Sequence, residues 1–394
     1  MTLWLRGGWS ARALTAVVVA VCGTVLVAQK SSPKDQKPDA AAAAQAQAQQ
    51  QEIQSLVRAA DAAMAGQGSA PADFPIQFQS DFLKAQGSRV WVPITLTIDP
   101  AKVPSGALTL YLRVVPRGMT APPPPTADPA AAPAGGKDKD KDKKDKDKKD
   151  KDKSAAAAPP APNYPFEDAA VLDVKPSAPG QPLRILRGIG VPSGSYDVYV
   201  VLHERAADPS QGRGVVPPGN PSPGKTSVLK QPLDVPNYGS GEFSTSTVIL
   251  AERVDELPAP IRPDQQSEHP YAFGPKEIVV APDHKFKKSQ ELIVLFQIYN
   301  PTVSPEKKFN LEATYTFYTQ GEGGEKRFNA TEPQTFSADS MGGGFDPTGN
   351  SSIQAGQGVP LQSFPEGTYR LEIKITDKLS NKVLTQNVNF TVTP

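Results

Sequence analysis

From Phe74 onward, apolar and polar residues alternate with a period of two along most of the chain. In RVWVPITLTIDP, the apolar positions fall at every second residue from Val90 to Ile98. In ALTLYLRVVP, the same alternation runs from Leu108 to Val114. A period of two is typical of a strand that buries one face. This part of the chain is therefore predicted to be all-β.

One phrase occurs twice in the alternating region, as VPSGSYDVYVVLHER and as FPEGTYRLEIKITDK. In each copy a glycine, Gly194 or Gly367, precedes a tyrosine, Tyr196 or Tyr369, and a strand pattern follows. Immunoglobulin-like sandwiches use such a corner where the chain crosses between sheets: a tyrosine hydroxyl bonds to a backbone carbonyl upstream. The repeat predicts two tandem immunoglobulin-like/fibronectin-III-like β-sandwiches, with these four residues as structural corners.

A different period precedes the strands. In EIQSLVRAADAAMAGQG, apolar residues fall at helical spacing from Ile53 through Leu56 and Ala60 to Met64, and Gly66 offers a stop. We expect a short helix over residues 52–66. Its apolar stripe is too thin for an independent domain, so we expect it to dock on the first sandwich.

Shifts in composition divide the chain into six parts. The predicted parts are a signal peptide (1–28), a disordered spacer (29–51), the short helix (52–66), sandwich one (72–254) with a disordered insert (117–163), a Pro-rich linker (255–269) and sandwich two (270–394). Neither half of 72–254 has enough strands to close a sandwich alone, so both halves are assigned to one domain.

The N-terminus has the pattern of a secretory signal. Arg6 and Arg12 precede an apolar run from Ala13 to Ala28, which is short for a membrane span. We expect an exported protein, periplasmic or extracellular, with an uncleaved N-terminal anchor as the alternative. Cys22 is the single cysteine, so the mature chain would have no disulfides, thiolate metal sites or cysteine nucleophile.

Charge narrows the range of partners. The formal net charge is +1, which does not favour nucleic acid or an anionic membrane surface. Lysine and aspartate alternate between Lys137 and Lys153, and so fine a mixture of charges predicts a solvated, disordered segment. A calcium loop beginning at Asp138 would need Gly and Glu where Lys143 and Lys149 stand. Whether this run has any binding role stays open.

No motif for catalysis stands out. The three histidines, His203, His269 and His284, lack chelate spacing, and neither His-Glu-x-x-His nor Gly-x-Ser-x-Gly occurs. We therefore expect no catalytic residue, no metal site and no cofactor.

Three aromatic residues remain as candidate contacts to a partner or a glycan. Trp91 lies opposite the apolar side of its strand, and Tyr111 and Tyr199 have the same outward register on strands expected nearby. An outward strip of these rings could stack on a sugar or on a protein. The alternative, which we favour, is that the helix or the second sandwich covers this face.

Two segments carry a resemblance to known families. TYRLEIKITDKLSNKVLTQNVNFTV resembles the closing strands of immunoglobulin-like modules in secreted bacterial proteins. PLDVPNYGSGEFSTSTVILAERV is similar to a segment of exported bacterial proteins of the GWxTD and von-Willebrand-A-related kind. The Gly-Trp-x-Thr-Asp motif and the Asp-x-Ser-x-Ser metal site are both absent, so the resemblance implies export and a sandwich fold and no activity.

Three hypotheses about function follow. The leading one is a non-enzymatic interaction or scaffold protein of the cell envelope, which binds a protein partner through sandwich faces and loops. The second is a carbohydrate-binding or adhesion module that uses the aromatic strip. The third is a hydrolase whose paired carboxylates only the fold would bring together.

Overall fold

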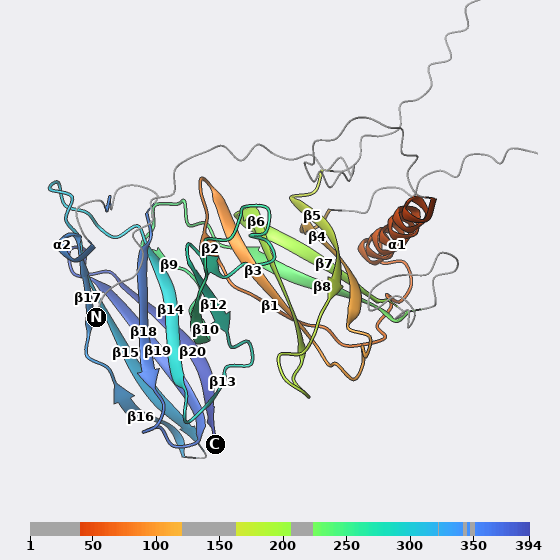
Figure 1. Cartoon of the computed structure of the whole chain (residues 1–394). Helices are drawn as coiled ribbons and strands as arrows, with labels where there is room; N and C mark the ends of the chain where they lie inside the picture. Colours follow the sequence, from red (N-terminus) through yellow and green to blue (C-terminus); the bar gives the residue numbers. More distant parts are fainter. Residues whose placement is uncertain (1–39, 120–162, 206–223, 322, 342–344, 347–350) are drawn as a thin grey trace, which may run out of the picture.

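The computed structural model describes residues 40–119, 163–205, 224–321, 323–341, 345–346 and 351–394 (Figure 1). The predicted signal peptide, the first part of the spacer and almost all of the predicted insert lie outside these residues. The described part is built mainly from antiparallel sheets. Figure 1 shows two sandwiches side by side, with one long helix at the far end of the first. The all-β sandwich fold is therefore confirmed.

The first sandwich has two four-stranded sheets. One sheet consists of β1 (Gln77–Ser80), β2 (Leu83–Lys84), β3 (Arg89–Ile98) and β6 (Leu183–Pro192). The other has the order β5-β4-β7-β8 and consists of β4 (Ala107–Pro116), β5 (Phe166–Asp173), β7 (Gly194–Glu204) and β8 (Thr226–Val235). β4 and β5 pair directly, so the two halves on either side of the predicted insert form one domain.

The second sandwich has two six-stranded sheets. One consists of β9 (Ser244–Thr245), β10 (Ile249–Glu256), β11 (Ala272–Phe273), β12 (Lys276–Val280), β14 (Glu291–Tyr299) and β18 (Ile353–Pro360). The other consists of β13 (Lys285–Lys287), β15 (Asn310–Gly321), β16 (Gly324–Ala330), β17 (Gln334–Ser337), β19 (Gly367–Asp377) and β20 (Val383–Thr393). A short helix, α2 (Ala338–Met341), follows β17.

The alternating positions form the two cores, as the pattern predicts. In the first sandwich, every second residue of β3 and β4 is buried between the sheets, from Val90 to Ile98 and from Leu108 to Val114. In the second, β15 and β19 supply the same kind of row, and rings such as Phe317 and Tyr315 pack with Phe364 and Phe296.

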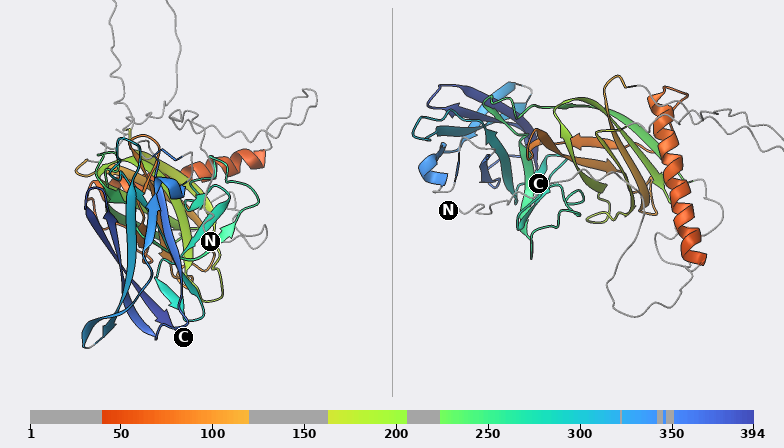
Figure 2. Two further views of the ribbon diagram at one scale, coloured as in Figure 1. Left: turned by 90° about the vertical axis from the view of Figure 1, so that its left-hand side faces the viewer. Right: turned by 90° about the horizontal axis from the view of Figure 1, so that it is seen from above.

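The helix α1 (Ala40–Met64) starts earlier than the sequence predicts. Residues 40–51, assigned to a disordered spacer, form its first turns, because alanine and glutamine are good helix formers. The second half of α1 packs on the outer face of β4 and β7, where Leu56 and Ala60 are buried. Figure 2 shows α1 lying across this sheet at the end of the molecule.

The predicted boundary between the sandwiches is wrong. The sequence pattern places residues 244–254 in sandwich one, but β9 and β10 both pair with β14 of the second sandwich. The predicted linker is the connection between β10 and β12, which pair with each other. Local alternation shows that ILAERV is a strand but does not show which sheet it joins, because strand pairing depends on distant residues.

The repeated phrase forms the predicted corner in both sandwiches. The Tyr196 hydroxyl donates to the carbonyl of Pro192 at 3.1 Å, and the Tyr369 hydroxyl donates to that of Pro365 at 2.6 Å. Gly194 and Gly367 have φ of 152° and 144°, a backbone region that residues with a side chain rarely adopt. The phrase therefore occurs twice because each sandwich needs the same turn.

Candidate interaction surface

Tyr111 and Tyr199 lie under α1. They point outward from β4 and β7, but only 2% and 3% of their surfaces remain exposed, because Leu56, Ala60 and their neighbours cover them. Burial raises the pKa of Tyr111. Neither ring is available to a partner while α1 is in place.

Ionic contacts hold α1 at both ends of this apolar cover. Arg113 of β4, itself buried, pairs with Asp61 of the helix at 2.5 Å and with Glu167 of β5 at 3.1 Å. Toward the other end, Glu52 accepts a hydrogen bond from Thr109 at 2.5 Å and pairs with Arg205 at 3.2 Å. The helix is thus placed by specific partners as well as by apolar contact.

Trp91 lies on the other sheet of the first sandwich, where the second sandwich covers it. Its indole Nε1 donates to the carbonyl of Pro270 at 2.9 Å. A Cβ on Gly188 would lie 2.1 Å from the ring, so only glycine leaves room for it. Trp91, Tyr111 and Tyr199 are therefore not neighbours, and no outward strip of these three rings forms. The helix covers Tyr111 and Tyr199, and the second sandwich covers Trp91, as the alternative prediction states.

The contact between the sandwiches is apolar at its centre. Leu83, Trp91 and Leu186 of the first sandwich pack against one face of the β10–β12–β14 sheet of the second. The residues from the second sandwich are Ile249, Ala251, Tyr271, Phe273, Ile278, Val280, Ile293 and Leu295.

Hydrogen bonds surround this apolar centre. Phe82 and Thr247 bond to each other in both directions, at 2.7 and 3.1 Å. The Gly188 amide donates to Ser267 in the predicted linker at 2.7 Å. The Tyr271 hydroxyl donates to Asp81 at 2.6 Å. The two sandwiches are thus packed together as one unit. Residues 255–269 do not form a free linker, because Ser267 bonds to the first sandwich.

One outer sheet face remains open in the described part of the chain. α1 covers the outer face of the β4–β7 sheet, and the sandwich contact covers part of the outer faces of the β3–β6 and β10–β14 sheets. The outer face of the β16–β15–β19–β20 sheet carries mainly polar side chains at its partly and fully exposed positions. They include Glu312, Thr314, Thr316, Tyr318, Arg370, Glu372, Lys374, Thr385 and Asn387. We call this surface the open face.

Arg370 organises the centre of the open face. Its guanidinium binds both carboxylate oxygens of Glu325, each at 2.7 Å, and reaches Glu372 at 3.0 Å. It also donates to Asn387 and lies 4.2 Å from the centre of the Tyr318 ring. Hydrogen bonds from Arg370 lower the pKa of Glu325, and the bond to Glu325 raises that of Arg370. The group is held by charge-assisted bonds before any partner arrives.

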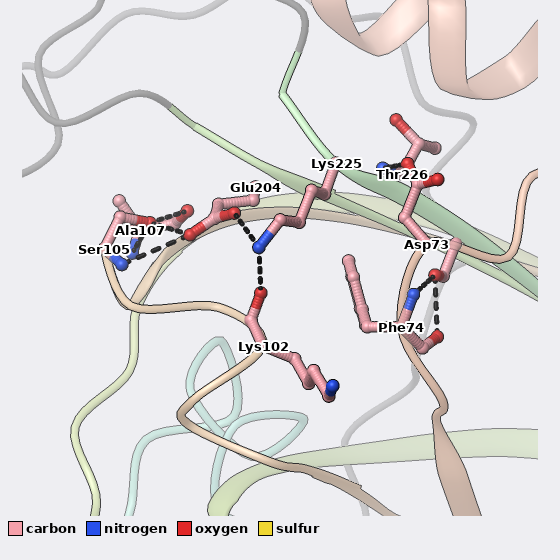
Figure 3. Close-up of polar contacts among 9 residues, drawn as sticks. Asp73, Phe74, Lys102, Ser105, Ala107, Glu204, Lys225 and Thr226 are labelled. Carbon is pink, nitrogen blue, oxygen red and sulfur yellow. Dashed lines mark hydrogen bonds and ion pairs between the residues drawn. The ribbon is translucent and has the colours of Figure 1, made fainter.

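A second polar cluster lies at one end of the first sandwich (Figure 3). Glu204, at the end of β7, accepts bonds from the hydroxyl and amide of Ser105 at 3.1 and 3.2 Å. Lys225 lies 4.0 Å from the other oxygen of Glu204 and donates to the Lys102 carbonyl at 2.7 Å. Asp73 accepts from the Thr226 amide at 2.7 Å. These bonds tie loops to strand ends and are structural.

The three histidines lie apart from one another. His203 contacts the Thr226 hydroxyl at 2.9 Å, and burial lowers its pKa. His269 contacts Glu277 at 2.8 Å, and His284 contacts the Asn389 carbonyl at 2.9 Å. Within the described ranges there is no group of three His, Cys, Asp or Glu that could hold a metal ion. Nor does any helix in those ranges have the length and apolar character to cross a membrane.

An open groove of about 430 Å³ runs beside the start of β20. Tyr238 and Glu242 of the connection from the first sandwich line one side, and Leu384 and Gln386 of β20 line the other. Gln386 bridges the groove by a bond to the Thr245 hydroxyl at 2.9 Å.

Comparison of the chain with protein-family models and with curated proteins found no match. The sequence alone does not predict the Arg370 group, although the alternation in the two strands places both Tyr318 and Arg370 outward. The missing information was the pairing of β15 with β19, which sets these two residues opposite each other.

Proposed function

We propose that this protein is an exported, non-enzymatic interaction or scaffold protein of the cell envelope, and that it binds a protein partner through the open face. The observation that carries the proposal is the preformed Arg370–Tyr318 group at the centre of that face. Arginine and tyrosine are enriched among the residues that dominate protein–protein binding energy, especially where they are held rigid before binding.

Two further features support this proposal. The apolar and hydrogen-bonded contact between the sandwiches gives the chain a fixed shape, as a scaffold requires. The signal-like N-terminus, with Arg6 and Arg12 before an apolar run, supports export. The glycan hypothesis loses its basis, because the aromatic strip on which it rested does not form.

The test is sedimentation of the purified full chain with cell-envelope fragments, either untreated or stripped of protein by protease. We expect binding to untreated fragments and its loss after protease treatment. Arg370→Ala should weaken that binding about tenfold or more, as expected for a central arginine. The matched control is Arg253→Ala, which removes another arginine paired with a carboxylate at 2.9 Å, on β10 of the other sheet.

Two results would overturn the proposal. Binding that survives protease treatment would identify a glycan or lipid ligand. Equal binding by Arg370→Ala and the unaltered chain would place the contact elsewhere.

A further inference from the structure

β20 has a free backbone edge over most of its length. On one side it pairs with β19 from Val383 to Val392. On the other side its neighbour in the described residues is β13, which pairs only with Thr391–Thr393. Figure 1 shows β13 beside the C-terminal end of β20. Residues 383–389 therefore present one edge without a strand partner.

The direction of the free backbone groups follows from two contacts near the C-terminal end of β20. The Thr391 amide donates to His284 at 2.8 Å, and the Asn389 carbonyl contacts the His284 ring at 2.9 Å. Both contacts lie on the side away from β19. In an antiparallel ladder the N–H and C=O of alternate residues point to the same side. Val383, Thr385 and Asn387 therefore also direct their N–H and C=O groups outward.

This edge lacks the usual protection against pairing. Proteins normally guard edge strands with charged residues, proline or short length. The edge strand β16 contains GEKRFNA, and β5 contains FEDAAVLD, so each has charges along it. The segment VLTQNVN at residues 383–389 has neither charge nor proline. It is thus chemically suited to accept another strand.

Apolar side chains gather at the same place. Of the four large hydrophobic residues exposed in the described part of the chain, Leu379 (46%) and Val383 (47%) lie at or just before the start of β20. Leu384 and Val388 point toward the core but are only partly buried. Leu384 also lines the groove beside the strand. A strand added at this edge would lie beside Val383, Leu384 and Val388.

We propose that the free edge of β20 pairs antiparallel with the same edge of a second copy of this chain, about a twofold axis at Gln386. Outward-pointing residues must face one another in such a ladder. An axis at Gln386 sets Thr385 opposite Asn387 of the second copy, and Val383 opposite Asn389. The Asn389 carbonyl already contacts the His284 ring, so the complete backbone bonds are those of the two Thr385–Asn387 pairs. The ladder ends at Val383 and Asn389, next to the residues that pair with β13.

The same register matches the side chains on the inner face. Leu384 of one copy lies opposite Val388 of the other, so the two partly buried apolar residues cover each other. The contact is isologous, as most homodimer contacts are, and brings no like charges together along the edge. It leaves the open face uncovered and extends it across both copies.

The test is the mass of the full chain in solution, measured by light scattering and sedimentation velocity over a range of concentrations. We expect a dimer. Thr385→Lys with Asn387→Lys places lysine opposite lysine twice across the axis, which should raise the dissociation constant about tenfold or more. Thr385→Lys with Asn387→Glu places lysine opposite glutamate in the same register and should restore the dimer.

Gln354→Lys serves as the control, because it adds a charge to an exposed position of β18, an edge strand of the other sheet. It should leave the dissociation constant unchanged, and circular dichroism checks that each variant is folded. A monomer at all concentrations would overturn the proposal. An unchanged dissociation constant in the variant with two lysines would overturn it too. So would a lysine–glutamate variant that dimerises no better than the variant with two lysines. Partner binding is measured separately through Arg370→Ala, so the two proposals can fail independently.

Discussion

Single hydroxyl groups determine how each sandwich turns its corner. Tyr196 and Tyr369 are almost fully buried, and each donates to a carbonyl four residues upstream. These roles were predictable from sequence, because the glycine, the tyrosine and the acceptor lie within one short phrase. The burial of Trp91 at the sandwich contact was not predictable in that way, because its hydrogen-bond acceptor, Pro270, is far away in the sequence.

Removing one of these hydroxyls should destabilise the protein without changing its fold. We expect Tyr369→Phe to lower the free energy of unfolding by about 1 kcal/mol, because the bond from the buried Tyr369 ring to the Pro365 carbonyl is lost. Urea unfolding measures the change. Tyr318→Phe, whose hydroxyl lies 3.5 Å from Glu372 on the open face, is the control and should have little effect. Equal stability of Tyr369→Phe and the unaltered chain would contradict the role given to the corner.

Asp81 should make the sandwich contact sensitive to pH. Burial raises its pKa from 3.8 to about 6, and the bond from Tyr271 offsets this only in part. A carboxyl group with a raised pKa binds its proton more tightly in the folded state. Stability therefore falls as pH rises from about 4 to 6, and the loss is complete above that range.

Asp81→Asn removes this dependence and keeps an acceptor for the Tyr271 hydroxyl. We expect the variant to be more stable than the unaltered chain by about 1–3 kcal/mol at pH 7.5, and equally stable at pH 4. Urea unfolding at both pH values, followed by Trp91 fluorescence in a Trp4→Phe/Trp9→Phe background, measures the difference. A difference that is the same at both pH values would show that Asp81 does not titrate in this way.

At the scale of elements, local pattern predicted which segments are strands and helices better than it predicted what they contact. The strand pattern of residues 249–254 was recognised, but its partner β14 lies in the second sandwich. The apolar face of α1 was recognised from Leu56 and Ala60, but the Glu52 and Asp61 contacts were not. Pairing and ionic contacts depend on residues far away in the chain, which a periodic pattern does not contain.

The packing of α1 should depend mainly on its apolar centre. Leu56→Asn puts an amide among Tyr111, Tyr199 and Val201, where burial of an unpaired polar group is costly. We expect the helix to separate from the sheet while both sandwiches stay folded, and brief proteolysis to cut within residues 40–64. Arg58→Asn, another change on α1 but away from this cluster, is the matched comparison. If both variants resist cleavage like the unaltered chain, ionic contacts alone suffice to hold the helix.

For the molecule as a whole, the number of sandwiches followed from the repeated phrase, but their relation to each other did not. The predicted linker suggested two modules joined by a free segment. Instead, Ser267, Pro270 and Tyr271 all bond to the first sandwich. An interface of this kind combines side chains from segments that are individually unremarkable, so no single stretch of sequence signals it.

The pairing of β4 with β5 has a practical consequence. Val114 and Phe166 are partners in the ladder, so the chain leaves β4 and enters β5 at adjacent points. A foreign domain whose own termini are close together could be grafted between these strands, because the entropy cost of closing a loop grows only slowly with its length. The connection between β4 and β5 is thus a suitable insertion site for a fluorescent reporter domain, far in sequence from the open face and from β20.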